Sequence, residues 1–117
     1  MVNILQLTSE AKVLIAAPAR PMAKEVADGI SKLVACYPQV VEAHLPYCMI
    51  FDVMEQPAQI LALTTKTMAE FQQVSQEIAT RLPNVLPSVM ALTIIFAEKE
   101  STFLEKVRGV RCRIYAR

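Results

Sequence analysis

The sequence has no apolar run long enough to cross a membrane as a helix. Its longest nearly apolar run extends from Val89 to Ala97 and is interrupted by Thr93, whereas a membrane-spanning helix needs about 20 predominantly apolar residues. Prolines or turn residues end the other apolar runs after a few positions. The chain is therefore expected to fold as a globular protein built from short strands and amphipathic helices.

Two long amphipathic helices are predicted from apolar residues that recur at three- and four-residue steps. The first follows Pro21, which the first turn of a helix tolerates, and ends before Pro38. The second begins at Thr67, an N-cap residue reinforced by Glu70, and ends at Pro83. Each helix has one polar face, so each is expected to pack on a sheet through its apolar face.

Strands are predicted between these helices. The β-branched run Lys12–Ala17 is typical of a buried core strand, and Val89–Ala97 is typical of a central strand buried on both faces. At 40–45 the apolar residues alternate, which places Glu42 and His44 on an outward face. The runs 47–53 and 59–65, separated by a turn at Glu55-Gln-Pro57, are expected to pair as a hairpin.

The last part of the chain predicts one more helix and one more strand. The short helix runs from Ser101, its cap, to about Val107, and Gly109 suits its C-terminal end. Residues 111–115 alternate as in an edge strand. The order is βαββαβ with an appended helix and strand, which predicts a single α+β domain over residues 1–117 with a ferredoxin-like sandwich.

Composition excludes several classes of function. The 117 residues include only 2 glycines, too few for a phosphate-cradling loop. The 3 cysteines, Cys36, Cys48 and Cys112, form no Cys-x-x-Cys pair, so neither a disulfide framework nor a zinc site is expected. The first residues lack the pattern of a secretory signal, which makes the cytoplasm the expected location. No cofactor or metal is expected, and no catalytic set of residues is recognisable.

Several segments together resemble the C-terminal domain of the enhanced serine sensitivity protein SseB family. They are Val13-Leu-Ile-Ala-Ala-Pro18 with the helix that follows, Tyr37-Pro-Gln-Val-Val-Glu-Ala-His-Leu45, and the end Ile114-Tyr-Ala-Arg117. The resemblance extends from about Lys12 to Arg117, except for Pro46–Gln56, and it does not include the N-terminal domain usual in that family. It implies a fold, a bacterial cytoplasmic setting and an association with serine tolerance, but no catalytic mechanism.

Positive charge is concentrated at the C-terminal end. Residues 1–98 have 6 basic and 9 acidic side chains, and residues 99–117 have 6 basic and 2 acidic ones. Such a cluster either binds a carboxylate, a phosphate or an acidic surface, or protects an edge strand from aggregation. Nucleic-acid binding is not expected at an overall charge of +1. The candidate ligand-binding residues are Arg108, Arg111, Arg113 and Arg117.

The segment Tyr47–Met54 is the strongest candidate for an interface, because as a loop it would expose a large apolar patch. The residues predicted to contact a partner are Tyr47, Met49, Ile50, Phe51 and Met54. The single histidine, His44, has no evident acid-base partner beyond Glu42. Cys112 is expected to be buried and inert, although Arg111 and Arg113 beside it leave a redox or persulfide role open.

Three functions fit these features. The leading prediction is a non-enzymatic protein-interaction or homo-oligomerisation module. The alternative is a regulatory domain that binds an amino acid or another small carboxylate through the C-terminal arginines, by analogy with other ferredoxin-like sheets. The third is a cysteine enzyme of sulfur metabolism, which rests only on three scattered thiols.

Overall fold

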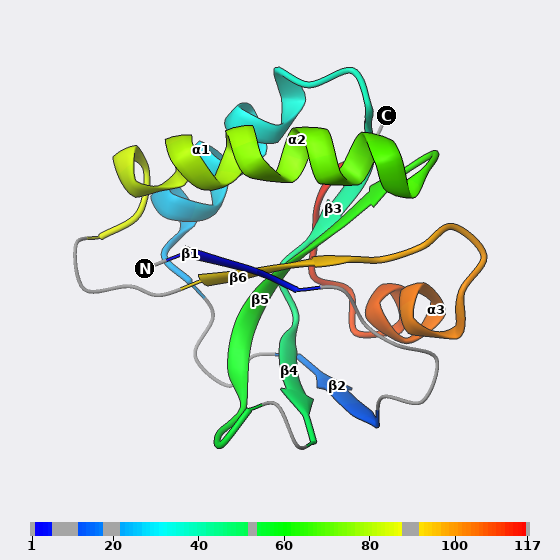
Figure 1. Ribbon diagram of the computed structural model, residues 1–117. Coiled ribbons are helices and arrows are strands. Elements are labelled where there is room, and N and C mark those ends of the chain that lie inside the picture. Colours follow the sequence, from blue (N-terminus) through cyan, green and yellow to red (C-terminus); the bar gives the residue numbers. More distant parts are fainter. Residues whose placement is uncertain (1, 6–11, 18–21, 52–53, 88–91, 117) are drawn as a thin grey trace.

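The protein is an α+β domain in which a mixed sheet has helices on both faces (Figure 1). Its structure, a computed structural model, describes residues 2–5, 12–17, 22–51, 54–87 and 92–116. The strands are β1 (Val2–Leu5), β2 (Val13–Ala16), β3 (Val40–His44), β4 (Tyr47–Ile50), β5 (Ala58–Thr65), β6 (Leu92–Phe96) and β7 (Arg113–Ala116). The helices are α1 (Lys24–Ala35), α2 (Met68–Arg81), the 3-10 turn η1 (Leu82–Asn84) and α3 (Thr102–Gly109).

The main sheet has the strand order β1-β6-β5-β3-β7. Strands β1, β6 and β5 are parallel to one another, and β3 runs antiparallel to both β5 and β7. Strand β5 is the longest strand, and its first residues pair with β4, which in turn pairs with β2. A ribbon formed by β2 and β4 therefore extends from the lower part of the main sheet (Figure 1).

The central strands β5 and β6 are buried on both faces because helices cover each side of the sheet. Leu61 and Leu63 of β5 point into a core with α1 and α2, whereas Ile60 and Ala62 point into a second core with α3. Figure 1 shows the same arrangement, with α1 and α2 above the sheet and α3 below it. This burial explains the nearly unbroken apolar sequence of these strands.

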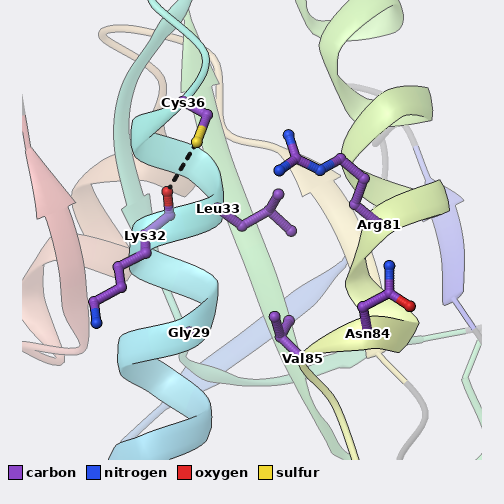
Figure 2. Close-up of a pocket in the computed structure, with 7 residues that line it drawn as sticks. All are labelled: Gly29, Lys32, Leu33, Cys36, Arg81, Asn84 and Val85. Carbon is purple, nitrogen blue, oxygen red and sulfur yellow. Dashed lines mark hydrogen bonds between the residues drawn. The ribbon is translucent and has the colours of Figure 1, made fainter.

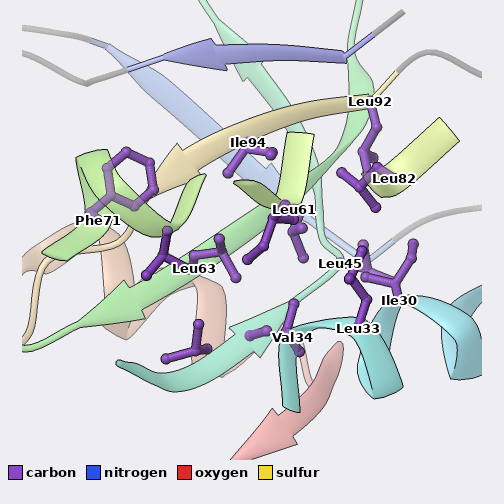
Figure 3. Close-up of a cluster of buried hydrophobic side chains, with 14 of the residues drawn as sticks. Ile30, Leu33, Val34, Leu45, Leu61, Leu63, Phe71, Leu82, Leu92 and Ile94 are labelled. Carbon is purple, nitrogen blue, oxygen red and sulfur yellow. The ribbon is translucent and has the colours of Figure 1, made fainter. Parts of the chain in front are cut away.

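The larger core lies between the sheet and the two long helices (Figure 3). Helix α2 begins as predicted, because the hydroxyl of Thr67 accepts a hydrogen bond from the backbone N–H of Glu70 at 3.1 Å. Its buried residue Phe71 packs against Phe96 of β6, with ring centroids 4.9 Å apart. Helix α1 contributes Ile30, among others, to the same core. The periodic apolar residues of both helices are thus core residues.

The smaller core lies under α3. Ser101 caps this helix, because its hydroxyl accepts a hydrogen bond from the backbone N–H of Leu104 at 3.1 Å. Leu104 and Val107 are buried against Ile60 and Ile95 of the sheet. Half-buried residues of the β2–β4 ribbon, Val13 and Ile15 among them, complete the core. The ribbon therefore has one face against α3.

Most predicted elements are confirmed, but two predictions about exposure are wrong. The run at 12–17 is not a core strand: β2 pairs only with β4 among the described strands, and Leu14 is exposed. Its apolar pattern reflects partial cover by α3 rather than a central position. Glu42 and His44 do not point into solvent, because α3 and its Arg108 cover that face of β3.

The ferredoxin-like arrangement is not confirmed. Split β-α-β units separate their two parallel strands by a third strand, whereas β5 and β6, which flank α2, are direct neighbours. The end of α3 also differs from expectation: Gly109 is its last helical residue, and the left-handed position falls on Arg111, whose φ is 57°. Within the part of the chain that the structure describes, no helix is long and apolar enough to cross a membrane.

Candidate functional site

The β2–β4 ribbon has a defined antiparallel register. Leu14 lies opposite Met49, and Ala16 lies opposite Tyr47. Beyond the end of β4, the backbone N–H of Phe51 donates to the carbonyl of Lys12 at 3.0 Å. Because directly opposite residues in an antiparallel pair point to the same face of a sheet, Leu14 and Ala16 share one face with Met49 and Tyr47.

This face of the ribbon is apolar and open to solvent. Leu14 is 61% exposed, Phe51 42% and Tyr47 36%, and Met49 is half-buried. The opposite face carries Val13, Ile15, Cys48 and Ile50, which pack into the core under α3. We call the open surface formed by Leu14, Tyr47, Met49 and Phe51 the outer ribbon face. It brings large apolar side chains from two distant parts of the sequence together.

The outer ribbon face agrees only in part with the interface predicted from sequence. Tyr47, Met49 and Phe51 lie on it, but Ile50 is buried in the core and the half-buried Met54 packs against that core. Ile50 does not lie on the outer ribbon face because β4 is a strand, in which alternate side chains point inward. Leu14 was missed because a short apolar run looks the same in sequence whether one or both of its faces are buried.

A second candidate site is a buried polar cluster between β3 and α3. The carboxylate of Glu42 accepts a hydrogen bond from His44 Nε2 at 2.6 Å and from Arg108 Nε at 3.1 Å. Arg108 Nη2 also donates to Glu42 Oε1, so the guanidinium holds both carboxylate oxygens. Glu42 and His44 are buried, whereas the side chain of Arg108 is 53% exposed. The cluster links the end of α3 to the middle of the sheet.

The surroundings determine the charge of each member of this cluster. The Arg108 guanidinium is the main cause that lowers the pKa of Glu42 from 4.5 to about 2, so Glu42 is ionised at neutral pH. Burial lowers the pKa of His44 and outweighs the opposing effect of the Glu42 carboxylate. The neutral ring must then carry its proton on Nε2, which leaves Nδ1 as an acceptor. Nδ1 is buried and has no hydrogen-bond partner among the described residues.

This geometry holds the fold together rather than presenting a reactive group. His44 is buried, and its Nε2 is already bonded to Glu42. A catalytic acid or base must be within hydrogen-bond reach of a substrate, and the His44 ring is almost fully buried, with Glu42 and Arg108 bonded in one cluster beside it. The cluster is therefore an internal ion pair with a histidine attached.

Two of the predicted ligand-binding arginines, Arg108 and Arg113, lie near His44, where burial is the largest cause that lowers the pKa of the ring and the positive charge of each arginine lowers it further. Arg108 binds Glu42, so its guanidinium already holds a carboxylate of the protein itself. Arg111 is exposed in the turn after α3, and Arg113 is exposed at the start of β7, opposite His44. Arg117 lies outside the described residues.

The three thiols differ in environment. Cys48 is buried, and burial raises its pKa to about 11. Cys112 is half-buried, burial also raises its pKa, and its thiol donates to the carbonyl of Val110 at 3.4 Å. Cys36 is exposed at the end of α1, and its thiol donates to the carbonyl of Lys32. No three His, Cys, Asp or Glu side chains of the described residues are placed to bind a metal ion.

An open cavity of about 310 Å³ lies between α1 and the end of α2 (Figure 2). It is lined by Gly29, Lys32, Leu33, Cys36, Arg81, Asn84 and Val85. The guanidinium of Arg81 donates to the hydroxyl of Tyr37 at 3.1 Å and lies over the Tyr37 ring. The volume is at the lower limit of ligand pockets. None of the predicted arginines lines this cavity.

Comparison with known proteins does not assign a family. No family model matches the chain, and no curated protein or solved structure matches it significantly.

Proposed function

We propose that this protein is a non-enzymatic protein-interaction module that binds its partner through the outer ribbon face. The observation that supports the proposal is the juxtaposition of Leu14, Tyr47 and Phe51, all large and apolar, on one open surface. Contiguous exposed apolar surface usually marks an interaction site. The resemblance to the SseB C-terminal domain remains a prediction from sequence.

The exposed area predicts the strength of the contact. Complete burial of an apolar side chain of this size contributes about 1.5 to 3 kcal/mol. Leu14, Tyr47 and Phe51 are already partly covered in the monomer, so covering them contributes together about 2 to 4 kcal/mol. The loss of rotational and translational freedom on association costs at least about 4 kcal/mol. The outer ribbon face therefore needs further contacts, such as backbone hydrogen bonds, to form a complex.

Site-specific photo-crosslinking tests this proposal. A benzophenone amino acid at Tyr47 is expected to form a covalent adduct with a protein chain, in the purified protein or in cell extract. The matched control carries the same amino acid at Gln73, an exposed residue of α2 on another face. The adduct from position 47 is expected to disappear when Leu14→Asp is added. Equal adducts from both positions, or an adduct that persists with Leu14→Asp, contradict the proposal.

The carboxylate-binding alternative has less support from the geometry. Its central residue, Arg108, is held by Glu42, so a ligand would have to displace an internal carboxylate. A thermal-shift assay against a panel of amino acids tests it, since ligand at 100 times its dissociation constant adds about 2.7 kcal/mol of stability. A shift that is lost with Arg113→Gln would support this alternative over the interaction module.

A further inference from the structure

The backbone hydrogen-bond pattern shows which residues of β2 face its open edge. The N–H of Phe51 donates to the carbonyl of Lys12, and Leu14 and Ala16 follow in the same register opposite Met49 and Tyr47. Antiparallel pairs alternate between hydrogen-bonded and non-hydrogen-bonded positions. Residues 12, 14 and 16 therefore direct their N–H and C=O groups toward β4.

The neighbouring pair of strands confirms this assignment. The N–H of Ile60 in β5 donates to the carbonyl of Pro46 at 3.0 Å. Residues 46 and 48 of the β4 segment thus face β5, and 47 and 49 face β2. It follows that Val13 and Ile15 direct their N–H and C=O groups away from β4. Among the described strands, β2 pairs only with β4, so these groups form an edge that no other described strand covers.

Apart from its short length of four residues, this edge lacks the features that keep most edge strands from pairing. Natural edge strands are protected by charged residues, proline or bulges. Residues 13–16 of β2, with the sequence VLIA, contain no charged residue, proline or glycine. The pairing of β2 with β4 is regular over all four residues. The edge is consequently a template for another strand.

We propose that β2 pairs antiparallel with β2 of a second copy of this chain, across a two-fold axis at Leu14. The inference goes beyond the proposed function, because strand pairing uses the open edge of β2 and leaves Tyr47 and Phe51 of the outer ribbon face uncovered. In this register Val13 lies opposite the partner's Ile15, and Ile15 lies opposite the partner's Val13. Each pair exchanges two backbone hydrogen bonds, so all four open N–H groups of the two edges are used. If the register is shifted by two residues in either direction, only one residue of each β2 forms backbone hydrogen bonds with the other copy's β2.

The side chains fit the same register. Leu14, the most exposed large apolar residue of the described chain, lies directly opposite the partner's Leu14 on the outer ribbon face. Such a non-hydrogen-bonded pair has a Cα–Cα distance of about 4.5 Å. Lys12 lies opposite the partner's Ala16, so like charges do not face each other. An isologous contact of this kind closes as a dimer.

The contact is small. Two four-residue edges bury much less than the roughly 1,600 Å² of a standard interface. The dimer is therefore expected to be weak and to depend on protein concentration.

Cysteine crosslinking tests the register directly. In a Cys36→Ser background, which removes the exposed native thiol, Leu14→Cys places two thiols across the two-fold axis within the Cα–Cα range of disulfides, about 4.4 to 6.8 Å. Ala16→Cys is the matched control, because its Cα lies about 13 Å from its counterpart, four residues along the strand. A disulfide-linked dimer is expected from position 14 only. Equal oxidation rates at both positions, or no dimer from a folded Leu14→Cys protein, overturn the inference.

Light scattering after size exclusion, over a concentration series, tests the native contact. Leu14→Lys is expected to raise the dimer dissociation constant at least about tenfold, because the apolar contact between the two Leu14 side chains is lost and two like charges then face each other. Met68→Lys, which changes an exposed apolar residue of α2, is expected to leave it unchanged. A monomer whose Tyr47 photo-crosslinks reach a different protein overturns the dimer but keeps the proposed function. A monomer without specific crosslinks overturns both.

Discussion

Replacing Arg108 by methionine is expected to destabilise the protein through a charge left behind on another residue. Methionine keeps most of the aliphatic length of arginine, but the buried Glu42 carboxylate loses the guanidinium that holds both of its oxygens. His44 remains as its hydrogen-bond donor. Breaking an ion pair by removing one partner costs more than the pair itself contributes, because the remaining charge is poorly solvated.

The lowered pKa of Glu42 gives the size of the expected loss in the free energy of unfolding. Moving the pKa from 4.5 to about 2 corresponds to about 3 kcal/mol of stability at neutral pH, since each pKa unit is worth about 1.4 kcal/mol. The side chain of Arg108 is half-exposed, so solvent screens the pair and the figure is an upper limit. We expect Arg108→Met to lower the free energy of unfolding by about 2 kcal/mol.

The pH dependence of stability shows whether the lost ion pair with Glu42 causes the destabilisation. A carboxyl group with a lowered folded-state pKa stabilises the protein above about pH 4.5, and that contribution is lost as the pH falls toward 2. In Arg108→Met the pKa of Glu42 rises, so the difference between the two proteins is expected to shrink as the pH falls through this window. Glu42→Gln combined with Arg108→Met gives the coupling energy by a double-mutant cycle.

Urea unfolding followed by circular dichroism measures these changes, because the chain has no tryptophan. Arg81→Met is the control, since Arg81 is exposed and donates to the hydroxyl of Tyr37 rather than to a buried carboxylate; it should change stability little at any pH. The reasoning would be refuted if Arg108→Met lowered the free energy of unfolding by less than about 0.5 kcal/mol and left its decrease at acid pH unchanged. The cluster would then contribute no more than a surface ion pair.

Three further predictions concern other parts of the molecule. Burial lowers the pKa of folded His44 below its ordinary value of 6.5, so as the pH falls the unfolded ring takes up a proton before the folded one. Wild-type stability should therefore begin to fall below about pH 6.5, and His44→Gln should flatten that part of the urea-derived stability curve. Thr67→Ala removes the cap of α2 and should cost about 1 kcal/mol in the same unfolding assay, whereas Thr80→Ala, within the exposed face of α2, should not. Iodoacetamide with mass-spectrometric mapping should modify Cys36 first and Cys48 only on unfolding; faster labelling of Cys112 than of Cys36 would revive the reactive-thiol hypothesis.

The helices could be predicted from sequence because their signals are local. Thr67 and Ser101 act as caps through hydrogen bonds to residues three positions later, and the apolar steps of α1 and α2 correspond to one core. Such contacts depend on neighbouring residues of the chain, so the sequence pattern and the structure agree.

Features that depend on distant pairing could not be predicted in this way. The parallel pairing of β1 with β6 joins residues from opposite ends of the chain, and no strand was predicted at 2–5. Glu42 is buried because Arg108 reaches it from a helix 66 positions later. Leu14 is exposed because β2 lies at an edge, a position that its apolar neighbours do not reveal.

Strand β5 contributes residues to both cores, so the two cores are expected to open together when the protein unfolds. Ile60 and Leu61 are adjacent in the chain, yet they lie in different cores on opposite faces of the sheet. Displacing β5 exposes both cores at once, so neither can serve as an independently stable substructure. The amide protons of the central part of β5 should therefore exchange with deuterium only through global opening, at a rate common to the two halves of the domain.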